Sequence, residues 1–300
     1  MGTDIDKIGT PECGDEDRNV PNRSGGGSPA ASPKDTFITV YGRMPVLEVL
    51  EDPDRLVDKI IVAEHSRGEN LGRILDLADR RGVPVQYATA NRVKLLAGNG
   101  KHDQGVLADV VAPRMRTVSA FLDGLRAGRP CHVVVLDGVN NPANVGMIIR
   151  TATAAGVSGV VLPHVGSPGI DPLVIKASAG VAFRASILRA RTAVDATEDL
   201  RRAGFRVFGL SGDGRSSLFR ARIPARSAFV LGNETEGVSP TVADHVDEWL
   251  SIPMAGGVES LNVASAAAVL CFDLMRRAEA EPPAANAGTR AGPRATRRTR

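Results

Sequence analysis

The chain has 300 residues, of which 43% are hydrophobic and only 4% aromatic, so it is long enough for two packed domains with aliphatic cores. Its formal net charge of +3 is lower than expected of a protein that binds nucleic acid by electrostatics alone. The apolar runs have strand length, which excludes a membrane span, and the acidic start lacks the regions of a signal peptide. We therefore expect a soluble cytoplasmic protein.

The residues that ligate metals are scattered. The three cysteines have no CxxC spacing, which disfavours both a zinc site and a disulfide framework and favours free thiols: Cys13, Cys131 and Cys271. The five histidines are isolated along the chain: His65, His102, His132, His164 and His245. No metal is predicted, and without a GxSxG segment a serine hydrolase is disfavoured.

The two ends of the chain are rich in Gly, Pro, Ala and Ser, and we predict that residues 1–36 and 281–300 are disordered. The last twenty residues carry five Arg against one Glu. This basic tail either adds weak RNA affinity or is simply solvated.

A periodic pattern begins at Phe37. Strands are predicted at 37–42, 58–63, 83–88 and 105–111, and helices at 44–51, 70–82 and 91–98. These elements predict a small α/β domain over residues 37–112. Residues 113–130 contain a helix framed by Pro113 and Pro130 and are predicted to be a linker.

Strands and helices alternate again over residues 131–280. Strands are predicted at 132–136, 159–163, 205–210, 227–232 and 248–253, and helices around 144–155, 171–180, 194–203 and 260–277. This alternation predicts a parallel sheet with helices on both faces. The GxGxxG pattern of a dinucleotide fold is missing after the first strand, so another loop would hold a nucleotide-like cofactor.

The loop after the first of these strands is rich in polar and special residues. Asn141, Pro142, Asn144 and Gly146 precede or open a helix in which Arg150 interrupts an apolar sequence. The apolar residues share one face of that helix: Val145, Ile148, Ile149, Ala152 and Ala155. Arg150 lies opposite this face, so we predict that its guanidinium points outward, and Asn144 stands where an N-cap is expected.

Two further loops follow strands in the same way. Gly232 and Gly237 flank a polar segment of four residues, and such glycines permit close backbone approaches. In the third loop Ser260 is predicted to cap an alanine-rich helix, with Asn262 in its first turn.

Together these loops, "NNPANVGMIIRTA", "LGNETEG" and "IPMAGGVESLNVASAAAV", resemble the three motifs of the SpoU (TrmH) family of RNA 2'-O-ribose methyltransferases in the SPOUT superfamily. In front of them, "YGRMPVLEVLE" and "HDQGVLADV" resemble the ribosomal-protein-like RNA-binding domain of members that methylate large-subunit rRNA, although Asp103 stands where those relatives often read His-Gln-Gly. The resemblance implies a small α/β RNA-binding domain followed by a parallel-sheet methyltransferase domain with a C-terminal trefoil knot, and a homodimer.

The resemblance also implies a cofactor, S-adenosylmethionine, and the residues that hold it: Gly232, Ile252 and Leu261, with Leu210, Ser211, Met254 and Asn262 nearby. Carried over in the same way, the catalytic residues are Asn144, Arg150, Glu234 and Asn262. Family proposals make Arg150 the general base, but a guanidinium is too basic to be neutral near pH 7. We prefer that Arg150 binds the phosphate beside the target ribose and stabilises the developing alkoxide, and that Asn144 and Glu234 orient it.

The expected reaction is methyl transfer to a ribose 2'-hydroxyl in RNA, with 23S rRNA favoured by the front domain. One alternative is a tRNA ribose methyltransferase. The other is a catalytically idle RNA-binding or ribosome-assembly protein, and the four intact catalytic positions argue against this second alternative. A housekeeping role is preferred to an antibiotic-resistance role, although resistance-conferring relatives resemble this chain in the same motifs. Candidate phosphate contacts in the front domain are Arg43, Arg67, Arg73 and Lys101, with ordinary surface charge as the alternative.

Overall fold

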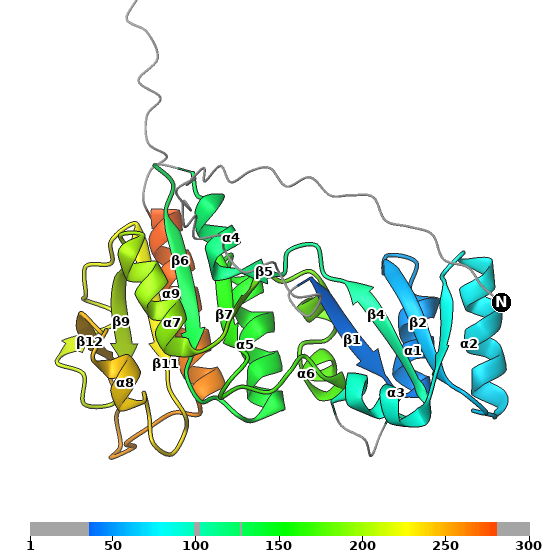
Figure 1. The fold of residues 1–300 in the computed structure, drawn as a ribbon. Helices are drawn as coiled ribbons and strands as arrows, with labels where there is room; N and C mark the ends of the chain where they lie inside the picture. Colours follow the sequence, from blue (N-terminus) through cyan, green and yellow to red (C-terminus); the bar gives the residue numbers. More distant parts are fainter. Residues whose placement is uncertain (1–35, 99–102, 127, 281–300) are drawn as a thin grey trace, which may run out of the picture. The chain divides into compact units, whose positions relative to one another are not determined.

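The computed structural model describes residues 36–98, 103–126 and 128–280, and two β-sheets lie within these ranges (Figure 1). Apart from Thr36, the two tails predicted to be disordered lie outside the described residues, as do Cys13, Lys101 and His102.

The first sheet has four strands in the order β1-β4-β2-β3: β1 Phe37–Tyr41, β4 Val106–Val111, β2 Val57–Ala63 and β3 Val85–Ala88. Strand β4 is antiparallel to both of its neighbours, and β2 is parallel to β3. Helices α1 (Arg43–Glu51) and α2 (Glu69–Arg80) pack on one face, and α3 (Ala90–Ala97) packs on the other. The strands and helices predicted for residues 37–111 are confirmed.

The second sheet has eight strands in the order β10-β12-β9-β11-β6-β7-β8-β5, and every pair of neighbours is parallel. Its strands are β5 Arg116–Thr117, β6 Cys131–Leu136, β7 Gly159–Pro163, β8 Ile187–Ala190, β9 Arg206–Leu210, β10 Ser216–Ser217, β11 Arg226–Leu231 and β12 Glu248–Ser251. The predicted parallel sheet is confirmed. The short strands β5, β8 and β10 were not predicted, and β5 lies inside the segment 113–130 that the sequence pattern assigned to a linker.

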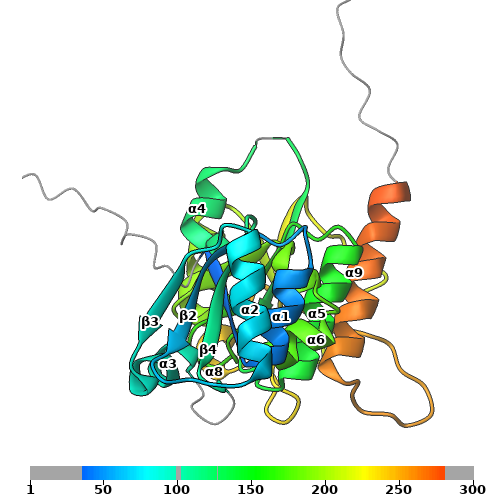
Figure 2. The ribbon, with the colours of Figure 1, turned by 90° about the vertical axis from the view of Figure 1, so that its right-hand side faces the viewer.

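Helices cover both faces of this sheet, as predicted. One face packs against α5 (Pro142–Ala154), α6 (Pro172–Ala177), the 3-10 turn η2 (Val181–Phe183) and α9 (Val263–Ala280). The other packs against α4 (Val118–Asp123), α7 (Ala193–Arg202) and α8 (Pro240–Ala243). Figure 2 shows α5, α6 and α9 side by side.

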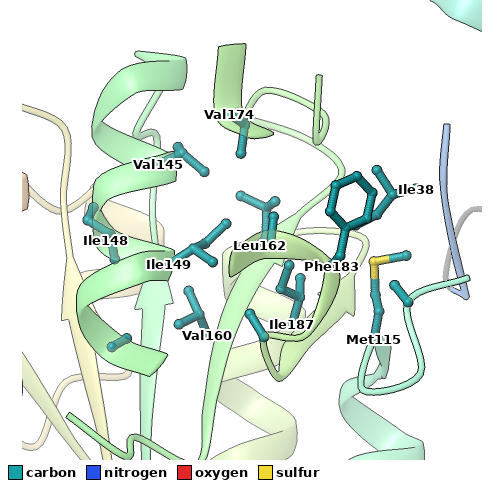
Figure 3. Packing of buried hydrophobic residues seen from close by; sticks show 14 of the residues in the cluster. Ile38, Met115, Val145, Ile148, Ile149, Val160, Leu162, Val174, Phe183 and Ile187 are labelled. Carbon is teal, nitrogen blue, oxygen red and sulfur yellow. The ribbon is translucent and has the colours of Figure 1, made fainter. Parts of the chain in front are cut away.

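The predicted apolar face of α5 is confirmed. Val145 and Ile149 point toward Val160 and Leu162 of β7, with Val174 of α6 close by (Figure 3). On the opposite side of the helix, the side chain of Arg150 is exposed, as predicted. The apolar spacing therefore fixes which face of α5 meets the sheet, and with it the direction of the polar residues at its N-terminal end.

A glycine sets the distance between α5 and α6. A methyl group on Gly146 would lie 2.6 Å from the Cβ of Ala177 and 2.7 Å from the carbonyl oxygen of Val174. The two helices thus cross in a contact that leaves no room for a side chain at this position.

Candidate functional site

A cavity of about 330 Å³ lies at the carboxyl ends of β9, β11 and β12. Six of the seven residues predicted to hold a cofactor line it: Leu210, Ser211, Gly232, Ile252, Met254 and Leu261. Asn262, the seventh, is next in the chain to Leu261 but is not part of the lining. The other wall residues were not among the predicted cofactor contacts, although Glu234 was predicted to be catalytic: Gly212, Leu231, Asn233, Glu234, Glu236, Gly237, Val238, Trp249, Leu250, Ser260, Val263 and Ala266. The structure therefore brings together three loops that are far apart in the sequence.

The loop after β11 is closed on itself by backbone hydrogen bonds. Asn233 and Gly237 each donate an amide N–H to the carbonyl of the other, at 2.9 Å in both directions. A methyl group on Gly232 would overlap the backbone of Gly237, so this close return of the chain requires glycine. The Asn233 amide also donates to the carbonyl of Gly138 at 3.1 Å, which joins the loop to the one after β6.

The opposite wall depends on close contacts made by other glycines. The ring of Trp249 lies over Gly209, where a methyl group would come within 2.5 Å of it. A methyl group on Gly212 would lie 2.9 Å from the carbonyl oxygen of Glu259. Trp249 is the single tryptophan of the chain, yet no periodic pattern singled it out, because its role depends on a glycine forty residues earlier in the sequence.

Three of the four predicted catalytic residues form a chain of hydrogen bonds. Asn144 is buried, with 4% of its surface exposed, and its Nδ2 donates to Oε1 of Glu234. Its Oδ1 accepts a hydrogen bond of 3.2 Å from Nδ2 of Asn262. The side-chain amide of Asn144 therefore connects the start of α5 with the loop after β11 and the start of α9.

The prediction that Asn144 is an N-cap is wrong. Helix α5 begins at Pro142, and its N-cap is Asn141, whose Oδ1 accepts from the backbone amide of Ala143 at 2.9 Å. Asn144 lies within the first turn of the helix, and its side chain is buried. The side-chain oxygen of a capping asparagine accepts a hydrogen bond from a backbone amide of the helix. In Asn144, by contrast, both the oxygen and the nitrogen of the side-chain amide form hydrogen bonds with other side chains.

Helix α9 begins later than predicted. It starts at Val263, and Oδ1 of Asn262 accepts hydrogen bonds from the backbone amides of Ala264 at 2.9 Å and Ser265 at 3.4 Å. Asn262 therefore precedes the helix and bonds its first exposed amides, and the predicted capping residue Ser260 lines the cavity instead. Since Oδ1 satisfies the helix, Nδ2 is left for Asn144.

Arg150 stands apart from this chain of hydrogen bonds. Its exposed guanidinium makes no hydrogen bond or ion pair with any residue that the structure describes, and it does not line the cavity. Six positions separate it from Asn144 on α5, which turns the two side chains well away from each other. Arg150 is therefore available to an external anion but is not positioned by Asn144 or Glu234.

The predicted phosphate contacts of the front domain differ in their surroundings. The guanidinium of Arg43 donates to the carbonyls of Gln104 at 3.3 Å and Arg67 at 2.8 Å, so it joins two loops. Arg73 pairs with Glu51 at 2.8 Å, and the side chain of Arg67 is exposed. Lys101 lies outside the described residues. Of the four, Arg67 alone is described as an exposed side chain that makes no ion pair or hydrogen bond of its own.

Asp103, which departs from the family pattern, stabilises a turn in the same region. It is buried, and its Oδ1 accepts from the backbone amide of Gly105 at 2.8 Å. This bond shapes the turn that leads into β4, where Gln104 has a φ of 49°.

Cys131 and Cys271 are free and buried, as predicted. Over the described ranges no three His, Cys, Asp or Glu side chains are grouped to hold a metal ion, and no helix there is long and apolar enough to cross a membrane.

The α/β fold with its parallel sheet matches the fold of solved SpoU methyltransferases. The structure resembles AviRb, the SpoU methyltransferase of Streptomyces viridochromogenes crystallised with AdoMet, at a TM-score of 0.55 and 23% identity over 82% of this chain and 92% of that one. It resembles the AdoMet-bound rRNA methyltransferase of Sinorhizobium meliloti equally well, with 23% identity over 81% of this chain and 88% of that one. At this identity, the likeness establishes the fold.

Sequence relationships identify the family. The SpoU rRNA Methylase family model matches residues 132–272, and the model for RNA 2'-O ribose methyltransferase substrate binding matches residues 39–116. The 23S rRNA (guanosine-2'-O-)-methyltransferase RlmB of Xylella fastidiosa is 33% identical over 239 residues, which are 79% of this chain and 96% of the relative. The enzyme of the same name from Ralstonia nicotianae is 33% identical over 229 residues, 76% of this chain and 91% of the relative. The chain belongs to the SpoU rRNA methylase family, which confirms the resemblance of its three motifs.

Proposed function

We propose that the chain transfers a methyl group from S-adenosylmethionine to the 2'-hydroxyl of a guanosine in 23S rRNA. The observation that carries this proposal is the cavity at the carboxyl edge of the parallel sheet, whose walls come from the second and third family motifs and whose residue Glu234 is bonded to Asn144 of the first. The names of the two relatives given above state that they methylate guanosine in 23S rRNA. The site of action is then the cytoplasm, where the ribosome is assembled.

The cavity fits the cofactor in size and in character. Its volume lies in the usual range for small-molecule sites, and leucine, isoleucine, valine, tryptophan and glycine dominate its walls. Apolar side chains and exposed backbone amides suit an adenine ring. Bound there, S-adenosylmethionine would supply an electrophilic methyl group, and the protein would supply position and a path for the hydroxyl proton.

Different side chains around the cavity position the reacting groups and stabilise the developing charge. Asn144 holds the carboxylate of Glu234 in one orientation, and Asn262 holds Asn144. Arg150 binds the phosphate beside the ribose and stabilises the developing alkoxide, a role that suits an exposed guanidinium with no bond to any residue in the described ranges. Alignment of the reacting atoms can supply roughly 7 to 11 kcal/mol of the barrier.

The domains take the roles that the sequence pattern suggested. Residues 37–112 bind the RNA substrate. In this domain Arg67 is the candidate phosphate contact whose side chain makes no ion pair or hydrogen bond with a described residue. Residues 113–130 connect this domain to residues 131–280, which catalyse the methyl transfer. The tails, residues 1–36 and 281–300, flank these units.

We also propose the trefoil knot of the SPOUT superfamily for the C-terminal part. Two sets of contacts support it. The segment after β9 lies tightly against β12 and Glu259, as the glycine contacts at Gly212 and Gly214 indicate. Further along the chain, the guanidinium of Arg277 in α9 donates to the carbonyls of Leu218 at 2.6 Å and Ala221 at 2.8 Å. The last helix is thus bonded to the loop around which a knot would form.

A homodimer completes the proposal. The outer face of α9 carries Phe272 and Met275, which are 50% and 37% exposed and stand three residues apart, so they share one side of the helix. Large apolar side chains grouped in this way are typical of a surface that a partner covers.

The test is transfer of labelled methyl from S-adenosylmethionine to unmodified total RNA, followed by mapping of the 2'-O-methyl group. Wild type is compared with Arg150→Ala and with Arg202→Ala, an exposed arginine on α7 at the other face of the sheet. We expect label in 23S rRNA for wild type and Arg202→Ala and its loss in Arg150→Ala. Label in tRNA would overturn the substrate, and RNA binding without transfer would indicate an idle scaffold.

A further inference from the structure

The lining of the cavity has an uneven charge. Among its residues are two carboxylates, Glu234 and Glu236, and no lysine, arginine or histidine. The cavity is therefore formally anionic. Apart from these two side chains its lining is apolar or carries neutral polar groups.

The two carboxylates differ in their partners. Glu234 accepts a hydrogen bond from Asn144, which is part of the chain of bonds described above. The carboxylate of Glu236 has no hydrogen bond or ion pair with any other residue in the described part of the chain. Among the residues that the structure describes, no cation forms an ion pair with either of them, so both charges are available to act on whatever occupies the cavity.

The backbone holds Glu236 in place. The reciprocal hydrogen bonds between Asn233 and Gly237 close the loop that carries both carboxylates, and Thr235 donates its backbone amide to Oδ1 of Asn233 at 2.7 Å. Although the side chain of Glu236 is exposed, its point of attachment at the cavity wall is thus fixed.

The reaction changes the charge of its cofactor by one unit. S-adenosylmethionine has a sulfonium cation, and its ammonium and carboxylate groups cancel, so its net charge is +1. When the carbon–sulfur bond breaks and the methyl group passes to the ribose oxygen, the electron pair stays on sulfur and the product is a neutral thioether. An anionic wall therefore attracts the donor more strongly than the product.

We propose that Glu236 is a specificity-determining residue that lets the cavity discriminate S-adenosylmethionine from S-adenosylhomocysteine. This inference rests on the proposed function. Because the Glu236 carboxylate is exposed to water, the discrimination it adds is roughly threefold to tenfold in relative affinity. Its consequence is that the donor displaces the product more completely at equal concentrations of the two.

The experiment is isothermal titration of both ligands into the full-length protein and its Glu236→Gln variant. A third ligand, in which an amine replaces the methyl sulfonium, restores the positive charge without the methyl chemistry. Glu259→Gln is the matched control, because Glu259 is an exposed carboxylate of the neighbouring loop that does not line the cavity.

In wild type we expect the donor and the amine analogue to bind more tightly than the thioether. Glu236→Gln should weaken both cationic ligands by roughly threefold to tenfold and leave the thioether unchanged, while Glu259→Gln changes none of them. The wild-type preference should also shrink between 50 mM and 500 mM salt. Equal weakening of all three ligands in Glu236→Gln, or no weakening at all, would overturn the role of Glu236. If wild type binds none of them at millimolar concentration, the proposed function itself is wrong.

Discussion

At the scale of single residues, the site depends on an amide whose two ends face different partners. Nδ2 of Asn144 can only donate, and it meets a carboxylate, while Oδ1 can only accept, and it meets the amide of Asn262. Asn144 itself is buried, so an amide end of Asn144 left without a partner cannot turn to water, whereas its partners Glu234 and Asn262 are exposed.

Asn144→Asp keeps the shape of the side chain and removes the donor. We expect it to destabilise the protein by about 1 to 3 kcal/mol and to lower methyl transfer more than Asn144→Ala does, because two carboxylates then face each other. Adding Glu234→Gln should restore part of the stability, since the glutamine amide can donate to the new carboxylate. Urea unfolding and single-turnover transfer measure the two effects. Equal stabilities of the single and double variants would show that the hydrogen bond contributes little.

A second prediction at this scale concerns Cys271. Burial raises the pKa of its thiol from the ordinary 9.0 to about 12. Between these values the unfolded thiol loses its proton while the folded thiol keeps it, so the folded state binds more protons and stability falls as pH rises. The fall should be about 1 kcal/mol for each pH unit above about 9.

Urea unfolding at pH 8, 9, 10 and 11 tests this for wild type and Cys271→Ala. The variant loses packing at every pH, but the difference between the two proteins should shrink as pH rises, because the alanine has no proton to keep. A difference that is constant across the four pH values contradicts the shifted pKa. Lysine and tyrosine titrate in both proteins, so the comparison cancels them.

The sequence predicted which residues gather at the site better than how each one acts. Asn141 and Asn144 both suit a cap, and the signal that separates them is Pro142, since proline favours the first position of a helix and so marks the residue before it as the cap. For Trp249 no such signal exists, and Glu236 was predicted only as part of the polar segment between Gly232 and Gly237. Their place in the wall depends on the shape of the loop after β11 and on the contact with Gly209.

At the scale of elements, two glycines within helices have opposite surroundings. Gly146 lies in the contact between α5 and α6, whereas nothing lies within 4 Å of a methyl group placed on Gly72 in α2. Gly146→Ala should therefore destabilise the protein by about 1 to 3 kcal/mol through overpacking. Gly72→Ala should stabilise it by about 0.5 to 1 kcal/mol, because alanine favours the helix.

Thermal and urea unfolding of the two variants measure this contrast with the same substitution in the same protein. Because Gly146 is close to Asn144, its variant should also lose methyl transfer, while Gly72→Ala should not. A Gly146→Ala protein as stable as wild type would mean that α6 moves away from α5 without cost.

The elements that the sequence predicted are those with a clear period. The stripe of Val145, Ile148 and Ile149 was enough to orient α5, and the long apolar strands β6, β7 and β11 were found in the same way. Strands β5 and β10 have two residues each, and α8 has four. Segments this short contain no full period, and their structure comes from the neighbours with which they pair.

At the scale of the whole molecule, alternation of strands and helices predicted the parallel sheet, and a parallel sheet gathers its loops at one edge. Periodicity does not predict how the chain passes between those loops, so neither the proposed knot nor the shape of the cavity can be derived from it. The close contacts at Gly209 and Gly212 join segments that are distant in the sequence, while the one at Gly232 closes the loop after β11 on itself.

The dimer is the last prediction. On the outer side of α9, Ala268 and Val269 are half-buried, and Phe272 and Met275 continue the same stripe toward the end of the helix. Phe272→Glu places a charge in the middle of this stripe, and since a buried unpaired carboxylate is costly, the variant should remain monomeric. Sedimentation at micromolar concentration should give twice 31.5 kDa for wild type and 31.5 kDa for Phe272→Glu. Leu56→Glu, at an apolar side chain of the front domain that is 65% exposed, should leave the dimer intact. A monomeric wild type would contradict the dimer, and a dimeric Phe272→Glu would place the interface elsewhere.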